Sequence, residues 1–375
     1  MAEVRLRYER RLDRDFNEAS DDRWDFQQRY RAGVEAKHGE SLLVRVVYQF
    51  SQTDGQNPAS PYARTTSRDA LESYAQYAAG GRTYIVGRQR VVKGESRLIG
   101  NAEWTATGRA WDGLRVSFGG WDAFYGKQAL NSTNNNDASL AFLAKNHSAG
   151  ETILIYKQDS RTAQTTRIYT LNHRLNKVQG TREYMVEGSL QAGRSAGLDV
   201  EAFAVSARAK WATKSRLSPF IEANVASGGG SATKVRTFDN LFPTNHPLYG
   251  QSDLQGLRNV VNLAVGADFK ASKFTKVRLE WNNFSLFDAS DAWYGASGAV
   301  NKRAGGSFVD PTGASGKAVG NELSLWATTT LTKHSVFNYG LSYFLPGKFI
   351  KSSVFNSGTN TKDQIWLVAQ YSWKF

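Results

Sequence analysis

The chain has 375 residues, a formal net charge of +13, no Cys and only seven Pro, and it is rich in Trp, Tyr, Phe and Gly. The absence of cysteine excludes a disulfide framework and any thiolate metal site or nucleophile. No run approaches the roughly 18 consecutive apolar residues of a spanning helix, which excludes a helical inner-membrane protein. The Lys and Arg residues are spread over the whole length, which argues against nucleic-acid binding.

Apolar and polar side chains alternate in segments that recur from one end of the chain to the other. Near the start, Val4, Leu6 and Tyr8 fall on one row, and Arg5 and Arg7 on the other. Because successive side chains of a strand point to opposite faces, each such segment predicts an amphipathic strand. The predicted strands are 4–8, 24–36, 42–50, 71–77, 83–91, 111–118, 121–127, 139–145, 152–158, 166–177, 182–191, 199–211, 217–225, 257–269, 275–287, 321–332, 336–344 and 364–375.

The last predicted strand has one wholly apolar row that ends in three aromatics. This row is Ile365, Leu367, Ala369, Tyr371, Trp373 and Phe375. A terminal aromatic strand of this kind is typical of the closing strand of a bacterial outer-membrane barrel, where the apolar row faces lipid. We expect it to pair with the strands 336–344 and 4–8. Since the first residues already alternate, we also expect the sequence to be the mature form, without its signal peptide.

The connections between the predicted strands alternate between short and long. Short links fall at 37–41, 79–82, 119–120, 148–151, 213–216, 272–274 and 334–335, and long polar ones at 12–22, 51–68, 92–110, 129–138, 228–256, 288–320 and 346–362. Short periplasmic turns and long outer loops are the outer-membrane pattern, and a soluble all-β sandwich has no reason to show it. The sequence therefore predicts one domain, 1–375. Its fold would be an all-β, transmembrane, antiparallel up-and-down barrel of about 18 strands, with 16 as the alternative, in the bacterial outer membrane.

Two stretches are more specific than this alternation. The first holds Gly87-Arg88-Gln89, Arg97-Leu98-Ile99-Gly100 and Trp111-Asp112-Gly113-Leu114-Arg115, and the second holds Leu241-Phe242-Pro243-Thr244-Asn245-His246 with Tyr249-Gly250. Together and in this order they resemble the alginate export family of bacterial outer-membrane proteins. The resemblance implies an eighteen-stranded barrel whose arginine-lined constriction passes an acidic polysaccharide, alginate in the type member.

A basic lumen is also expected from the residues themselves. The arginines assigned to the lumen row are Arg5, Arg7, Arg29, Arg31, Arg45, Arg88, Arg90, Arg115 and Arg278. Arginine stays charged and holds a carboxylate with a planar fork, so a series of them can pass an anion from site to site. The alternative is that lumen acids such as Glu9, Glu35 and Asp122 pair with them and rigidify the wall.

Two of the long loops carry further candidate residues. The loop 92–110 is predicted to fold inward as a constriction in which Arg97, Arg109 and Glu103 set selectivity, with an ordinary surface loop as the alternative. In the second loop, Phe242 and Pro243 are expected to anchor a packed segment that includes Tyr249. A ligand role for Asn245 or His246 is the weaker alternative there.

We predict a channel that is not an enzyme, because the five His are scattered and no catalytic motif is present. It would pass anionic solutes, foremost an acidic exopolysaccharide or its oligomers. The alternatives are a general or small-anion porin and a barrel that encloses or anchors a partner. Expected partners are membrane lipid, lipopolysaccharide, the anion and periplasmic export machinery. The protein itself is expected to be a monomer. No metal or cofactor is predicted. For the segment 288–291, a calcium site is a weaker interpretation than a solvated polar loop.

Overall fold

A computed structural model describes residues 1–17, 22–55, 66–129, 138–161, 164–212, 216–303, 306–355 and 360–375. Its strands are β1 (Ala2–Leu12), β2 (Arg23–His38), β3 (Leu42–Gly55), β4 (Thr66–Ala79), β5 (Arg82–Gln89), β6 (Trp111–Phe118), β7 (Trp121–Gln128), β8 (Ala138–His147), β9 (Gly150–Asp159), β10 (Thr166–Gln179), β11 (Arg182–Ser195), β12 (Leu198–Trp211), β13 (Leu217–Ala226), β14 (Lys234–Val235), β15 (Val260–Lys270), β16 (Thr275–Ser285), β17 (Lys302–Arg303), β18 (Gly306–Ser307), β19 (Ala318–Thr330), β20 (Ser335–Pro346) and β21 (Gln364–Lys374). The one helix in the described ranges is α1 (Lys348–Phe355).

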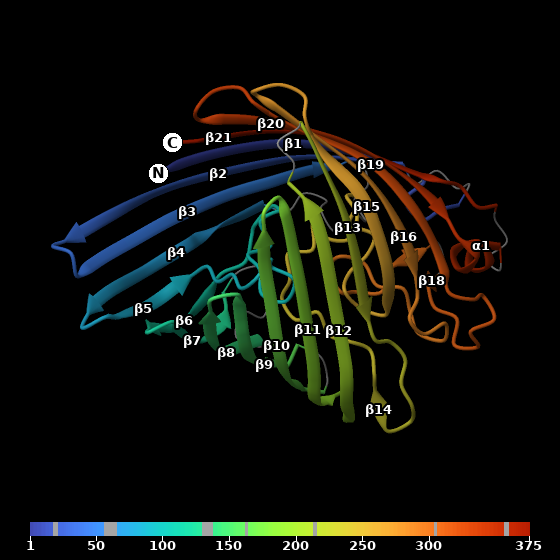
Figure 1. Ribbon diagram of the computed structural model, residues 1–375, viewed down its shortest axis with the longest axis horizontal. Helices are drawn as coiled ribbons and strands as arrows, with labels where there is room; N and C mark the ends of the chain where they lie inside the picture. The colour runs from blue at the N-terminus through green and yellow to red at the C-terminus, as the bar shows by residue number, and fades with distance from the viewer. Residues whose placement is uncertain are drawn as a thin grey trace.

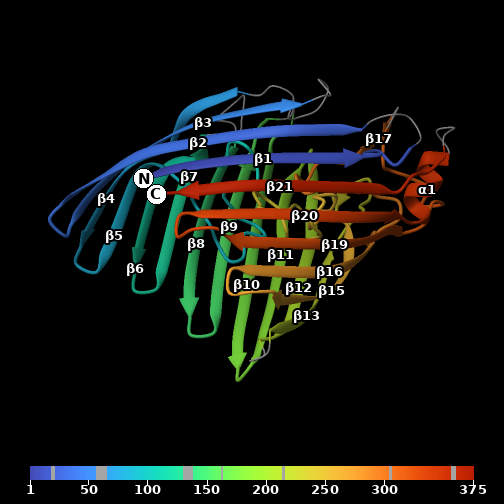
Figure 2. The same cartoon turned by 90° about the horizontal axis from the view of Figure 1, so that it is seen from above.

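The main sheet closes on itself as a barrel. Each long strand pairs antiparallel with its neighbour in sequence, and β1 pairs with both β2 and β21. Of the nineteen strands in this sheet, the two-residue β14 only adds to β12, which leaves eighteen barrel strands in the described residues. Figure 2 shows the two termini side by side, where β21 lies between β20 and β1. Closure removes both sheet edges, which would otherwise expose unpaired backbone groups to lipid.

The fold class, the closing strand and its two partners are confirmed, with small differences at the strand ends. The predicted strand 257–269 begins at Val260, and 83–91 ends at Gln89. The helix α1 lies in a segment that the sequence predicted only as a loop. In the described part of the chain, no helix combines the length and apolar character needed to cross a membrane.

The alternation of loop lengths is also present. The short turns gather at the end of the barrel where the termini lie, and the long connections lie at the other end (Figures 1 and 2). One connection at the long-loop end departs from the pattern, because β11 and β12 are joined by residues 196–197 alone. The predicted loops 51–68 and 129–138 and the predicted turn 213–216 lie largely outside the described residues.

The outer and inner rows of the strands have different surroundings. Apolar side chains on the outer rows are widely exposed, as at Leu190, Val86 and Tyr125, which are 64%, 58% and 55% exposed. Such a surface is compatible with lipid. On the inner rows of the long-loop half, apolar residues such as Phe142 and Ile155 are buried in one core cluster together with Phe242 and Trp293 from the loops. The long connections therefore fill the lumen from that end.

Candidate functional site: an inward plug and two cavities beneath it

Two long connections, 90–110 and 227–259, fold into the barrel and pair with each other (Figure 1). The backbone N–H of Phe242 donates to the carbonyl of Leu98 at 2.9 Å, and that of Gly100 donates to the carbonyl of Phe242 at 2.8 Å. Two residues further, the N–H of Thr244 donates to the carbonyl of Ser96 at 2.9 Å. The two predicted family motifs thus meet in a single unit, here called the plug. The prediction that 92–110 folds inward agrees with this arrangement.

Phe242 anchors the plug as the sequence suggested. Its ring meets the buried Trp111 edge-on with 4.8 Å between ring centroids. Arg109 lies beside it and donates to the carbonyls of Gly100, at 2.8 Å, and Pro243, at 3.1 Å. Burial lowers the pKa of Arg109 to about 10. Arg109 therefore holds the two loops together inside the plug and does not line either of the cavities described below.

Arg97, the second predicted constriction residue, is also internal. Its side chain is 1% exposed and contacts Glu222 at 2.7 Å, the Tyr249 hydroxyl at 3.0 Å and Asn224 at 3.2 Å. A guanidinium with this set of partners can be buried because its charge and donors are satisfied. Arg97 and Tyr249 thus tie both loops of the plug to the wall strand β13, and Asn245 is likewise buried in the plug.

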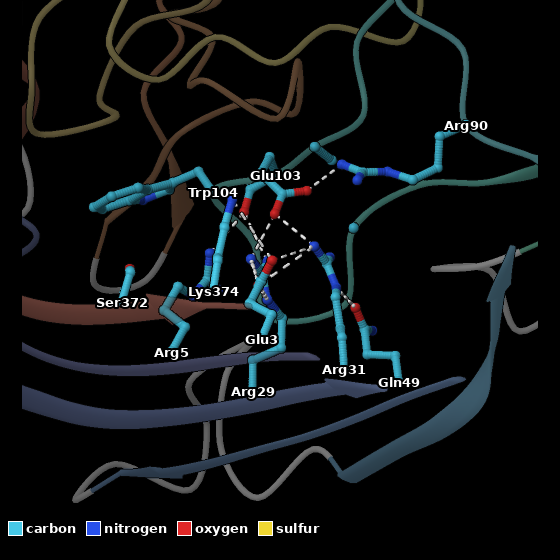
Figure 3. A network of polar contacts seen from close by, with 12 residues as sticks. Glu3, Arg5, Arg29, Arg31, Gln49, Arg90, Glu103, Trp104, Ser372 and Lys374 are labelled. Atoms are coloured by element: carbon cyan, nitrogen blue, oxygen red, sulfur yellow. Dashed lines mark hydrogen bonds and ion pairs between the residues drawn. The ribbon is translucent and has the colours of Figure 1, made fainter. Parts of the chain in front are cut away.

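Glu103 is the predicted constriction residue that faces open space. Its carboxylate contacts Arg29 at 2.5 Å and Arg31 at 2.6 Å, and it is also paired with Arg90 (Figure 3). The carboxylate of Glu3 joins this network through Arg29 at 2.6 Å. Burial alone would raise the pKa of Glu103, but the three guanidinium groups outweigh it and hold that pKa well below its usual range.

Arg5 and Arg7, on the wall beside this network, hold the plug by its backbone. Arg5 donates to the carbonyls of Glu103 and Thr105, each at 2.7 Å, and Arg7 donates to the carbonyl of Trp104 at 2.7 Å. The guanidinium of Arg7 also lies over the Trp104 ring, 3.9 Å from its centroid. The arginines predicted to form a basic ladder on β1 and β2 thus bind the protein's own loop.

The other predicted lumen arginines do not all lie inside. Arg45, Arg115 and Arg278 are on inner rows, where each pairs with an acid, Arg278 with Asp268 at 2.7 Å and Arg115 with Asp122 at 2.6 Å. The lumen assignment of Arg88 is wrong. It lies in register between Ser73 and Asp112, on the outer row with Val86, and pairs with Asp112 at 2.8 Å. Both rows of β5 carry apolar side chains, so alternation did not define its inner face.

A cluster of aromatic rings lies where the plug meets the barrel wall. His246 stacks on Trp104 with 3.6 Å between ring centroids, and its Nδ1 lies 3.0 Å from Asp253. Both rings stand steeply against Trp326 and Trp366 on the wall, at centroid distances near 6 Å. A ligand role for His246 was the weaker alternative from the sequence. In the structure, this side chain lies at the edge of the cavities described next.

Two cavities, of about 530 and 510 Å³, flank this stack, and Trp104, His246 and Asn338 line both. They lie at the short-turn end, as the lining residues Lys270 and Lys333 show, which is the periplasmic end in barrels of this class. Among the described residues that line them, the cationic ones are Arg5, Arg29, Lys210, Lys270, Lys276, Arg278, Lys333 and Lys374, and the acidic ones are Glu3, Glu103 and Asp268.

Most of these lining residues were not predicted from the sequence. Lys210 and Lys276 lie on the inner rows of their strands, as the predicted arginines do, and were not predicted because only arginines were selected. Trp326 shows the same parity on its strand. Trp104 carries no strand signal, so its position depends on how the loop folds.

Calcium at 288–291 was the weaker alternative in the sequence. In the structure, the carboxylates of this segment accept hydrogen bonds from the protein itself. Asp291 accepts from the backbone of Gly229 at 2.8 Å, and Asp288 accepts from Ser290. Within the described ranges, no three His, Asp or Glu side chains are grouped so as to hold a metal ion.

Comparison with known proteins agrees with this architecture. Three Pseudomonas aeruginosa structures illustrate the match, and each alignment covers 99% of this chain. OccK5 (OpdH) gives a TM-score of 0.63 at 10% identity over 96% of its own length, and OprD gives 0.61 at 12% over 92%. OccK2 (OpdF), solved in complex with glucuronate, gives 0.63 at 11% over 95%.

No curated protein sequence matched the chain. The family model described as alginate export matches residues 1–362, which is nearly the whole sequence. The family and the structural neighbours are channel proteins and not enzymes. This chain therefore belongs to the alginate export family of bacterial outer-membrane β-barrel proteins.

Proposed function

We propose that this outer-membrane channel passes anionic solutes, and foremost an acidic polysaccharide or its oligomers. The observation that carries the proposal is the surplus of cationic side chains around the two cavities at the short-turn end. Fixed charges of one sign in a confined, partly desolvated space focus the electric field and raise the local concentration of ions of the opposite sign.

The lysines contribute more to this surplus than the arginines do. Arg29 and Arg278 are paired with Glu103 and Asp268, so much of their charge is compensated. For Lys270, Lys276 and Lys333, by contrast, no acidic group among the described residues lies within ion-pairing distance. Lysine is a mobile point charge that binds carboxylates without a fixed geometry, which suits weak and repeated contacts along a path.

Two comparisons support an acidic sugar as the solute. The family description names alginate, a polymer of uronic acids, and OccK2 was solved with glucuronate, a single uronic acid. The aromatic cluster between the plug and the wall adds apolar surface that a sugar ring can contact and that a small inorganic anion does not need.

The plug sets the conditions for passage. It fills the long-loop half of the lumen, and its Glu103 occupies the guanidinium cluster that would otherwise be the strongest carboxylate site on the path. Conduction through the plugged barrel is therefore expected to be low, and a polymer requires the plug to shift from the position seen here.

The reversal potential of the purified protein in planar bilayers under a KCl gradient tests this proposal. We expect anion preference, a low single-channel conductance, and concentration-dependent block by an oligomer of mannuronate. A large conductance with weak selectivity and no block would indicate a general porin instead. Cation preference would contradict an anion path altogether, and a stoichiometric protein that co-purifies inside the lumen would support an enclosing barrel.

A further inference from the structure

We propose that Trp326 is the floor of a binding subsite for one uronate residue, in the cavity of about 530 Å³ at the short-turn end. The subsite would hold a pyranose ring that carries a carboxylate. The inference rests on the proposed function for the identity of the solute, and it adds the place and the side chains that recognise it.

The indole of Trp326 lies flat against the barrel wall. Trp326 is directly opposite Gly340 on β20, and a Cβ at that glycine would come within 2.6 Å of the indole ring. Because Gly340 has no side chain, one face of the Trp326 ring can pack against the strand. Trp326 also lines the cavity, so part of its ring borders the open space. A flat, rigid aromatic face can cover the C–H face of a sugar ring at little entropic cost.

Polar and cationic groups surround this face on neighbouring strands. Arg278 is directly opposite Trp326 on β16, and Lys276 is opposite Thr328, the next inward residue of β19. Directly opposite residues place their Cβ atoms about 4.5–5.5 Å apart, and diagonal ones about 7–8 Å, within reach of a lysine. Asn338 lies opposite Thr328 on the other side. A sugar on Trp326 would thus have Lys276 available for its carboxylate and Asn338 for a hydroxyl.

The plug closes the subsite from above. The rings of Trp104 and His246 stand at 64° and 66° to the Trp326 ring, with centroids 6.0 and 5.8 Å away, and all three residues line the cavity. Trp104 itself cannot be the ring on which the sugar stacks, because both the His246 ring and the Arg7 guanidinium already pack over it. The volume of the cavity is within the about 300–1,000 Å³ range of small-molecule sites.

The test is single-channel recording with a mannuronate trimer added on the short-turn side, with mannotriose as the neutral counterpart. We expect Trp326→Ala to shorten the dwell time of the uronate trimer about tenfold, which corresponds to about 1.4 kcal/mol. Trp326→Phe, which keeps an aromatic face, should restore most of it. Lys276→Gln should shorten the dwell of the uronate trimer and leave that of mannotriose unchanged.

The matched control is Trp281→Ala on the outer row of β16, where the ring is 39% exposed and faces lipid. Its dwell times should equal those of the unmodified protein. The subsite is overturned if Trp326→Ala leaves the dwell time unchanged, if Trp281→Ala shortens it equally, or if both trimers bind alike and Lys276→Gln has no effect. In each case an anion-selective reversal potential would still support the proposed function. Cation preference without any block by the uronate would remove that function as well.

Discussion

The two halves of this barrel are built from the same strands but enclose different interiors. In the long-loop half the inner rows carry apolar residues such as Phe142 and Phe344, which pack against Phe242 and Trp293 of the inward segments. In the short-turn half the inner rows carry Lys276, Arg278 and other charged residues around the two cavities.

The difference shows that an inward position does not itself select a polar residue. What matters is whether the side chain faces water or protein. The long connections bring apolar surface into the lumen, and burying this surface favours apolar partners on the wall, at about 25 cal/mol for each Å² removed from water. The short turns bring no chain with them, so the wall beneath them stays hydrated and can carry charge.

The largest effect should come from removing one of the two loops of the plug. Replacing residues 93–108 by a short Gly-Ser linker would delete the segment that pairs with Leu241–Thr244 and that Arg5 and Arg29 hold. We expect single-channel conductance to rise severalfold, because one of the two paired loops that fill the long-loop half is then gone. Heat-modifiable mobility on gels would verify that the barrel is still closed. An unchanged conductance would show that the narrowest point lies elsewhere.

A second prediction concerns the stability of the filled half. Arg97→Met would leave the buried Glu222 without its closest cation, and breaking a buried pair from one side typically costs about 3–5 kcal/mol. The guanidinium midpoint of unfolding in detergent, followed by tryptophan fluorescence, measures this loss. Arg88→Met, which breaks an outer-row pair with Asp112, should cost about 1 kcal/mol or less. Equal losses would contradict the buried role of Arg97.

Charge in the open half should control selectivity. Arg278→Gln removes one cation from a cavity wall, while Arg88→Gln removes the same charge from the outer row. We expect only the first to reduce the anion preference measured as the reversal potential in a KCl gradient. If both variants shifted it equally, selectivity would reflect the charge of the whole protein and not that of the lumen.

Glu103 connects the two halves, and its removal should have a smaller effect in the opposite direction. Glu103→Gln would release Arg29, Arg31 and Arg90 from a shared carboxylate. We expect a higher anion preference and longer block by a mannuronate trimer. Glu201→Gln, at an exposed pair with Lys234, is the matched control and should change neither quantity. Reduced anion preference in Glu103→Gln would contradict the idea that this carboxylate competes with the solute.

The smallest effect is expected from mild acidification. Since the pKa of Glu103 is held below its ordinary value of 4.5, its ion pairs are fully present above that value and are lost only as pH falls through the lower, folded-state pKa. Conductance should therefore stay constant between about pH 5 and 8 as far as this residue is concerned. A pH-dependent change in this window that Glu103→Gln abolished would show that the carboxylate titrates there.

Much of the barrel follows from the sequence alone. Strict alternation at Val4–Tyr8 and along the closing strand fixed the inner and outer rows, because the period of two in a strand leaves only one way to face lipid with apolar groups. The loop lengths indicated which end holds the turns. Where both rows carry apolar side chains, as in β5, alternation does not distinguish the two faces, and Arg88 was assigned to the wrong one.

The site depended on tertiary structure. Arg97 and Arg109 belong to a loop with the composition of a pore constriction, yet pairing with the segment around Phe242 turned them into internal ties. Only the closed barrel brings Trp104, His246, Trp326 and Lys276 around one space, since they come from two loops and two strands. Alternation is a local property that neighbouring residues reveal, whereas the position of a loop inside the lumen depends on contacts between residues more than a hundred positions apart.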